Sequence, residues 1–155
     1  MFPHKILLFR VRQQRDGFRG REPADLLKIP DGTITEAGLR TNISVSLQYL
    51  ESWLRGSGCV PINNLMEDAA TVEISRAQIW EWIRHPKGIL DDGRKVTIDL
   101  FSELLNDELA KIRASIGEEQ FSRRKFQTAS DILDSIITSE QFVEFLTLPA
   151  YQYLQ

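Results

Sequence analysis

Two adjacent carboxylates, Glu67 and Asp68, have the residue types and the surroundings that could support chemistry. Two small residues, Ala69 and Ala70, follow them and leave room for a ligand to approach. An ionised carboxylate acts as a general base when it is held within hydrogen-bond distance of the proton that it removes. Acidic residues at a helix start also have a simpler role, because they cap the helix and interact favourably with its dipole. From these residues alone both interpretations remain open.

Other kinds of site find little support in the sequence. His4 and His85 are far apart and have no cluster of cysteines or carboxylates at ligand spacing, so no metal site is predicted. Cys59 has no histidine near it and is expected to be a buried or half-buried small hydrophobic residue. Neither standard glycine-rich phosphate loop occurs. A base also needs a group that stabilises the charge it creates, so the partners of a catalytic Asp68 are expected on another domain or chain.

The length and composition predict one globular domain. The chain has 155 residues, of which 42% are hydrophobic and 26% are charged, as in soluble proteins. One cysteine excludes an internal disulfide and is typical of a reducing compartment. No apolar run reaches membrane-spanning length, and no signal peptide is apparent. We therefore expect a cytoplasmic protein with no membrane partner.

Residues 1–32 are predicted to form an extended basic arm. Up to Glu22 the arm contains six basic residues and two acidic ones, and it ends in a turn signal at Ile29-Pro30-Asp31-Gly32. A basic arm could bind phosphate or nucleic acid. It lacks the interleaved aromatic pattern that grips single strands, so a solvated or partner-docked extension is favoured and no nucleic-acid partner is expected.

Residues 33–155 are predicted to form an all-α bundle of about five helices. Apolar residues recur at helical spacing, as in Leu39, Ile43 and Leu47 of the first helix and Phe126 and Leu133 of the fourth. Four helices are expected to start at capping signals: Thr33 with Glu36, Ser75 with Gln78, Thr97, and Thr138 with Gln141. Glycines are expected to end the first helix at Gly56 and the third at Gly117.

Several runs of sequence together resemble one known family. The runs are Ile29-Pro30-Asp31-Gly32 with the following residues to Arg40, Gly58-Cys59-Val60-Pro61-Ile62, Leu65-Met66-Glu67-Asp68-Ala69-Ala70-Thr71, Glu73-Ile74-Ser75-Arg76-Ala77-Gln78, Leu90-Asp91-Asp92-Gly93-Arg94 and Phe145-Leu146-Thr147-Leu148-Pro149. They resemble the C-terminal helical domain of malate synthase, A-type isoform. The similarity extends over nearly everything after about residue 20.

The resemblance implies a reaction and a role for three residues. Malate synthase condenses acetyl-CoA with glyoxylate and water to give malate and CoA in the glyoxylate cycle. Asp68 falls on the aspartate of the family's Met-Glu-Asp motif, which removes a methyl proton from acetyl-CoA. Met66 is expected to border the acetyl-CoA site, and Cys59 is expected near the same cavity. Glu67 is expected to be structural.

The resemblance also implies that much of the enzyme is missing from this chain. The family's Mg²⁺ ligands, catalytic arginine and glyoxylate pocket lie on an upstream TIM barrel, a fold that takes about 250 residues. We therefore expect the isolated chain to bind no cofactor and to be inactive unless a barrel is supplied in cis or in trans. Arg12-Gln13-Gln14-Arg15-Asp16 resembles the linker between barrel and helical domain, whereas residues 1–9 do not match.

A fragment of this kind leaves a second hypothesis open. The chain could be a non-enzymatic helical remnant, or a protein-binding module that uses the former barrel-facing surface. A bare surface of that type is expected to expose an apolar patch.

Overall fold

A computed structural model describes residues 32–154, and the predicted basic arm therefore lies almost entirely outside the described residues. The elements follow in the order α3 (Glu36–Leu54), β1 (Val60–Ile62), β2 (Leu65–Glu67), α4 (Ala69–Arg84), α5 (Ile98–Ile116), α6 (Glu118–Arg123), α7 (Phe126–Thr138), α8 (Thr147–Ala150) and the 3₁₀ helix η1 (Tyr151–Tyr153). The predicted all-α class is confirmed. The sheet within residues 32–154 has two strands, so the eight-stranded barrel is not among them.

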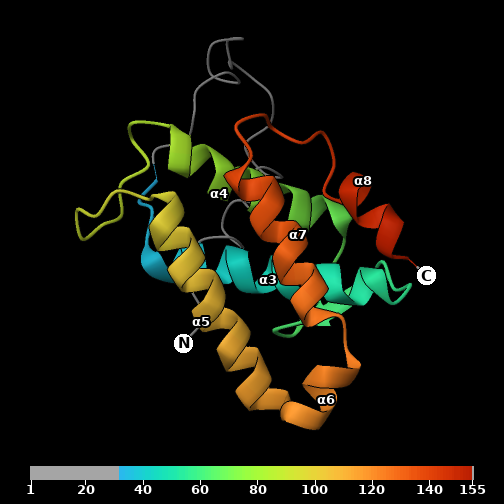
Figure 1. Ribbon diagram of the computed structural model, residues 1–155. Helices are drawn as coiled ribbons and strands as arrows, with labels where there is room; N and C mark the ends of the chain where they lie inside the picture. The colour runs from blue at the N-terminus through green and yellow to red at the C-terminus, as the bar shows by residue number, and fades with distance from the viewer. Residues whose placement is uncertain (1–31, 155) are drawn as a thin grey trace, which may run out of the picture. The chain divides into compact units, whose positions relative to one another are not determined.

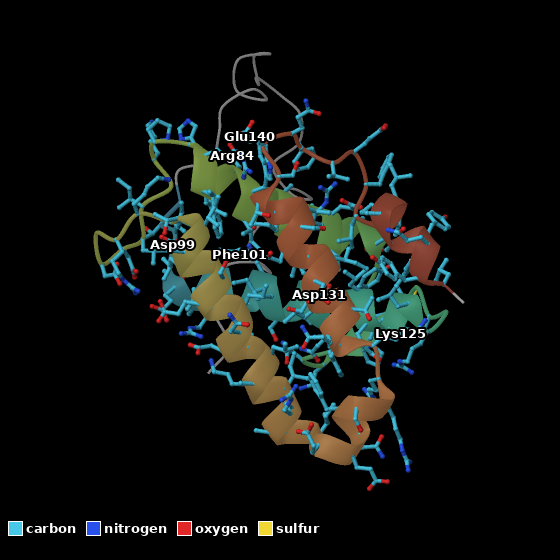
Figure 2. The ribbon with its side chains drawn as sticks, in the orientation of Figure 1. Arg84, Asp99, Phe101, Lys125, Asp131 and Glu140 are labelled. Atoms are coloured by element: carbon cyan, nitrogen blue, oxygen red, sulfur yellow. The ribbon has the colours of Figure 1, made fainter. Side chains whose placement is uncertain are left out.

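Helix α3 is the element against which the other long helices pack. Helices α4, α5 and α7 all contact it, and Figure 1 shows α5 and α7 crossing in front of it. Leu39, Ile43, Leu47 and Leu50 on α3 are completely buried. Phe101 of α5 is also completely buried, and Figure 2 shows it on the side of α5 that faces α3. The predicted apolar stripe of the first helix is therefore the centre of the core.

The third predicted helix has the expected ends, whereas the first begins two residues later than expected. The Thr97 hydroxyl accepts a hydrogen bond from the Leu100 amide at 3.1 Å, and Gly117 ends α5 with a φ of 81°. Thr33 was predicted to cap α3, but the cap is Thr35, whose hydroxyl accepts from the Gly38 amide at 3.0 Å. The reason is that the chain is still extended at residue 34, where it pairs with residue 90.

Two further predicted helix starts are wrong. Helix α4 begins at Ala69, and Ser75, the predicted cap, is a buried residue inside it. No helix begins at Thr138, because it is the last residue of α7 and its hydroxyl donates to the Asp134 carbonyl at 2.8 Å. The segment from 139 to 146 is not helical, and the short helix α8 follows it. In both cases a hydroxyl residue suited to a cap lies within a longer helix.

The C-terminal end of α4 is closed by a lysine. Lys95 Nζ donates to the carbonyls of Trp82, His85 and Gly88 at 2.6, 2.8 and 3.1 Å. Carbonyls at the end of a helix lack partners within it, and a cation is favourable there. Partial burial lowers the pKa of Lys95 below the usual lysine value. A Cβ on Gly88 would lie 1.8 Å from the Trp82 oxygen, so only glycine fits this turn.

Replacing Gly88 with alanine should displace the end of α4. The added methyl group cannot share space with a backbone oxygen, and overpacking of this kind costs about 1 to 3 kcal/mol of the free energy of unfolding. The measurement is urea denaturation followed by circular dichroism. Gly58→Ala is the matched control, because a Cβ there has no atom within 4 Å. Equal stability of the two variants would contradict the packing seen at Gly88.

Candidate functional site

A β-hairpin with a two-residue loop precedes the predicted catalytic aspartate, Asp68. Strands β1 and β2 are antiparallel, and Asn63 and Asn64 between them have φ values of 51° and 63°. Left-handed conformations at both loop positions are typical of type I′ hairpins, and asparagine tolerates them better than most residues. Sequence reasoning treated this region as a loop. The signal that could have revealed the hairpin is the Asn-Asn pair between two short apolar runs.

The hairpin gathers the three residues that the sequence singled out. Val60 pairs with Glu67, so Cys59 and Asp68 adjoin the same end of the ladder. Met66 pairs with Pro61 one position further along, and its side chain is 69% exposed. Asp68 is exposed as well, whereas Glu67 is buried. Cys59 is exposed, so the expectation that it is buried or half-buried is wrong. Asp68, Met66 and Cys59 therefore belong to one short exposed structure.

Asp68 is the N-cap of α4. Its Oδ1 accepts hydrogen bonds from the Thr71 amide at 3.0 Å and from the Thr71 hydroxyl at 3.3 Å. The amide of Thr71 is the main reason why the pKa of Asp68 is lower than usual, and its hydroxyl and the Ala70 amide lower it further. The capping interpretation is thus confirmed. The carboxylate is also ionised at neutral pH, fixed in orientation and exposed, so it could accept a proton from a ligand that comes within hydrogen-bond distance.

Tyr49 of α3 lies beneath this structure and was missed by sequence reasoning. Its side chain is 1% exposed, and its hydroxyl donates to the Gly58 carbonyl at 3.2 Å. Burial raises the pKa of Tyr49, and nearby Cys59 and Asp68 raise it further. The central helix therefore supports the loop that precedes the hairpin. Tyr49 lies one helical turn after Val45, which is also buried, and neither residue belongs to the apolar stripe predicted for the first helix.

A buried arginine holds α4 against the segment that follows α7. Arg76 is 2% exposed; it pairs with Glu73, and its Nη2 donates to the Glu144 carbonyl at 2.9 Å. Its guanidinium carbon lies 4.3 Å from the centre of the Phe142 ring. Glu73 Oε1 in turn accepts from the Leu146 amide at 2.7 Å. In the non-helical 139–146 segment, the Glu144 carbonyl and the Leu146 amide thus form hydrogen bonds with α4 side chains, whereas in a helix they would bond to other backbone groups.

The last turn of α4 is attached to the end of α7 and to the residue that follows it. Arg84 Nη1 donates to the Ile137 carbonyl at 3.1 Å, and Trp80 Nε1 donates to the Ser139 carbonyl at 3.0 Å. The Arg84 guanidinium stacks over the Trp80 ring at 4.1 Å. Figure 2 shows Arg84 beside Glu140, where the end of α4 meets the chain leaving α7. The helix that carries Asp68 is therefore anchored along its length.

The described residues do not surround Asp68 with a complete site. Within residues 32–154, no three His, Cys, Asp or Glu side chains converge to hold a metal ion. A groove of about 600 Å³ lies along α5 and is lined by Arg113, Glu118 and Gln127 but by none of the predicted site residues. In this part of the chain no helix combines the length and apolar character needed to cross a membrane.

The described residues form a helical domain in which the Asp68 carboxylate is exposed and held in place between β2 and α4. Residues 33–154 match the family model described as malate synthase, C-terminal. The chain therefore belongs to the malate synthase C-terminal domain family.

Individual relatives agree with this family. The chain is 50% identical over 132 residues to malate synthase A of Escherichia coli (strain K12), covering 84% of this chain and 25% of that protein. It is 49% identical over 132 residues to malate synthase of Myxococcus xanthus, covering 85% of this chain and 24% of that protein. Glyoxysomal malate synthase of Glycine max is 45% identical over 132 residues, or 84% of this chain and 23% of that protein. The chain thus spans about a quarter of the length of these curated relatives.

Removing the buried cation should loosen the attachment of α4. Arg76→Met is expected to lower the free energy of unfolding by about 2 to 4 kcal/mol, because it leaves Glu73 and the Glu144 carbonyl without their partner. Urea denaturation measures the loss, and hydrogen exchange at the Leu146 amide reports the loosening directly.

The matched control is Arg124→Met, since Arg124 is exposed. Surface changes of this type stay within about 0.5 kcal/mol of the wild type. A loss no greater in Arg76→Met than in the control would show that the buried ion pair does not stabilise the segment.

Proposed function

We propose that this chain is the catalytic-base domain of a malate synthase and that Asp68 is the base. The observation that carries the proposal is the exposed, ionised and fixed carboxylate of Asp68 within the region that matches the family. The activity belongs to the whole enzyme. We expect the isolated chain to show no turnover, because the remaining catalytic parts lie on a barrel supplied in cis or in trans.

The chemistry that Asp68 would perform is one proton transfer. A carboxylate oxygen takes a proton from the methyl group of acetyl-CoA, and the electron pair of the broken C–H bond forms the enolate. The enolate carbon attacks the aldehyde carbon of glyoxylate, and hydrolysis of the resulting thioester gives malate and CoA. Acetyl-CoA is a weak carbon acid, so the contribution of the base depends on close and oriented contact. Because Asp68 caps a helix that is held in place, its carboxylate has the fixed orientation that such contact needs.

Stabilisation of the enolate must come from another part of the enzyme. The described residues form no ligand set for Mg²⁺, so we propose that the ion implied by the family is held by the absent barrel, together with the catalytic arginine and the glyoxylate pocket. When bound there, the ion would supply charge stabilisation. The helical domain would close over the mouth of the barrel and exclude water from Asp68.

Exposed apolar side chains of the hairpin, of α4 and of the 139–146 segment support such a docking surface. Leu65 and Met66 on the hairpin are 62% and 69% exposed. Ile74 and Phe145, next to the Glu73–Leu146 contact, are 60% and 51% exposed. Large exposed apolar groups mark interaction surfaces when they cluster. We propose that this surface faces the barrel and that Met66 and Cys59 border bound acetyl-CoA.

Two smaller points belong to the same proposal. The family match begins at residue 33, which supports a domain boundary between the arm, residues 1–32, and the helical domain, residues 33–155. Cys59 is a free and exposed thiol, as is usual in a reducing compartment, so we propose a cytoplasmic location. The alternative function, a helical remnant or protein-binding module, would use the same apolar surface without chemistry.

The substitution Asp68→Asn should abolish most of the activity without loosening the helix. Asparagine caps helices about as well as aspartate, but its amide cannot accept the methyl proton. The assay is CoA release from acetyl-CoA, glyoxylate and Mg²⁺, with this chain added to a malate synthase barrel fragment. We expect turnover to fall on the order of 10²- to 10⁴-fold while the melting temperature stays close to that of the wild type.

Two controls make the test specific. Asp131→Asn makes the same chemical change on α7 and should leave turnover unchanged. Asp68→Ala removes the cap as well as the base and should lower the melting temperature in addition. If the wild-type chain binds the barrel and no CoA is released, the binding-module alternative is favoured; turnover by the pure chain would refute the assignment of metal and arginine to a separate barrel.

A further inference from the structure

The cap of α4 differs from the other side-chain caps in the described part of the chain. Thr35 and Thr97 each accept one hydrogen bond, from the backbone amide three residues later. Asp68 accepts the equivalent bond from Thr71, and the Thr71 hydroxyl adds a second. Both bonds end on Oδ1 of Asp68. The residue three positions after the cap is glycine or leucine in the other two helices, and neither can supply a hydroxyl.

We propose that Thr71 is a positioning residue for the base: it holds Oδ1 of Asp68 so that Oδ2 is the oxygen that takes the proton. The inference rests on the proposed function of Asp68. A carboxylate held through a single contact can still rotate about its Cβ–Cγ bond, whereas two donors on one oxygen restrict that rotation. The oxygen without these donors keeps its lone pairs available for the incoming proton.

The residue type suits this role. Threonine is branched at Cβ, so in a helix its χ1 is restricted mainly to two rotamers, and the one seen here places the hydroxyl 3.3 Å from Asp68 Oδ1. Thr71 is half-buried on the first turn of α4, and the residues beside it, Ala69 and Ala70, are small and exposed. The donors approach Asp68 from the helix, and small neighbours leave a path for substrate.

A carboxyl titration tests the contact without any assay of activity. The 155-residue protein is labelled with ¹³C at aspartate carboxyl carbons, and the Asp68 signal is followed with pH in the wild type, Thr71→Val and Thr71→Ser. A hydrogen bond to the ionised form lowers a pKa, so the pKa of Asp68 should rise in Thr71→Val and return toward the wild-type value in Thr71→Ser. An unchanged pKa in Thr71→Val would overturn the inference.

The comparison isolates the hydroxyl. Valine has nearly the shape of threonine and keeps the backbone amide, so the first hydrogen bond to Asp68 remains. Glu67 and Cys59 on the hairpin, Glu73 on α4 and Tyr49 on α3 are the ionisable groups of this region, and none of them changes. Thr41→Val is the matched control, because the Thr41 hydroxyl donates to the Ala37 carbonyl on α3 at 2.8 Å. It should leave the titration of Asp68 unaltered.

Kinetics with the added barrel test the positioning role. Thr71→Val should lower kcat on the order of tenfold, with KM within about twofold of the wild type, because substrate still binds beside a less well oriented base. Thr71→Ser should recover most of the loss. Full activity of Thr71→Val would overturn the positioning role even if the pKa moves. Failure of the proposed function is distinguishable, since the wild-type mixture would then release no CoA while the titration still reports the contact.

Discussion

The hydrogen bonds between Asp68 and Thr71 are the interaction on which the rest of the site depends. They begin helix α4, they fix the direction of the carboxylate, and they lower its pKa below the usual aspartate value. A structural cap and a candidate base are usually alternative explanations for an acidic residue at a helix start. Here both hydrogen bonds of the cap end on Oδ1, and under the proposed function Oδ2 would take the proton.

A capping carboxylate keeps a fixed position only when the helix that it caps is itself held in place. Helix α4 meets this condition through polar contacts as well as apolar packing. Arg76 is almost fully buried, and an unpaired charge there would be strongly destabilising. Its contacts with Glu73, the Glu144 carbonyl and the Phe142 ring compensate for that burial. These contacts are directional, so they fix the relative position of α4 and the 139–146 segment more specifically than an aliphatic side chain would.

The sequence predicts an element correctly where the local residue pattern and the tertiary packing favour the same helix and the same helix end. The buried stripe of α3 and the ends of α5 at Thr97 and Gly117 were predicted because apolar spacing, a capping hydroxyl and a glycine coincide there. Ser75 and Thr138 have equally good capping signals, yet Ser75 lies inside α4 and Thr138 is the last residue of α7. A local motif does not reveal whether the preceding residues are already helical.

The contacts of Arg76 were beyond sequence reasoning for a different reason. Its partners include a backbone carbonyl 68 residues away, and backbone groups carry no sequence signature. The hairpin was closer to being predictable, because Asn63 and Asn64 suit left-handed positions. Asp68 itself was identified through resemblance, and the geometry explains why an exposed carboxylate there is held in place.

Exposure of Asp68 sets a constraint on how the proposed site would work. A carboxylate with a lowered pKa is reliably ionised, but it is a weak base while water solvates it. Covering the hairpin with a barrel would remove water, and desolvation raises the pKa of a carboxylate. The hydrogen bonds from Thr71 would oppose that rise and keep the group ionised during closure. Under the proposed function, the carboxylate would thus be charged before docking and would become a stronger base only when substrate is enclosed.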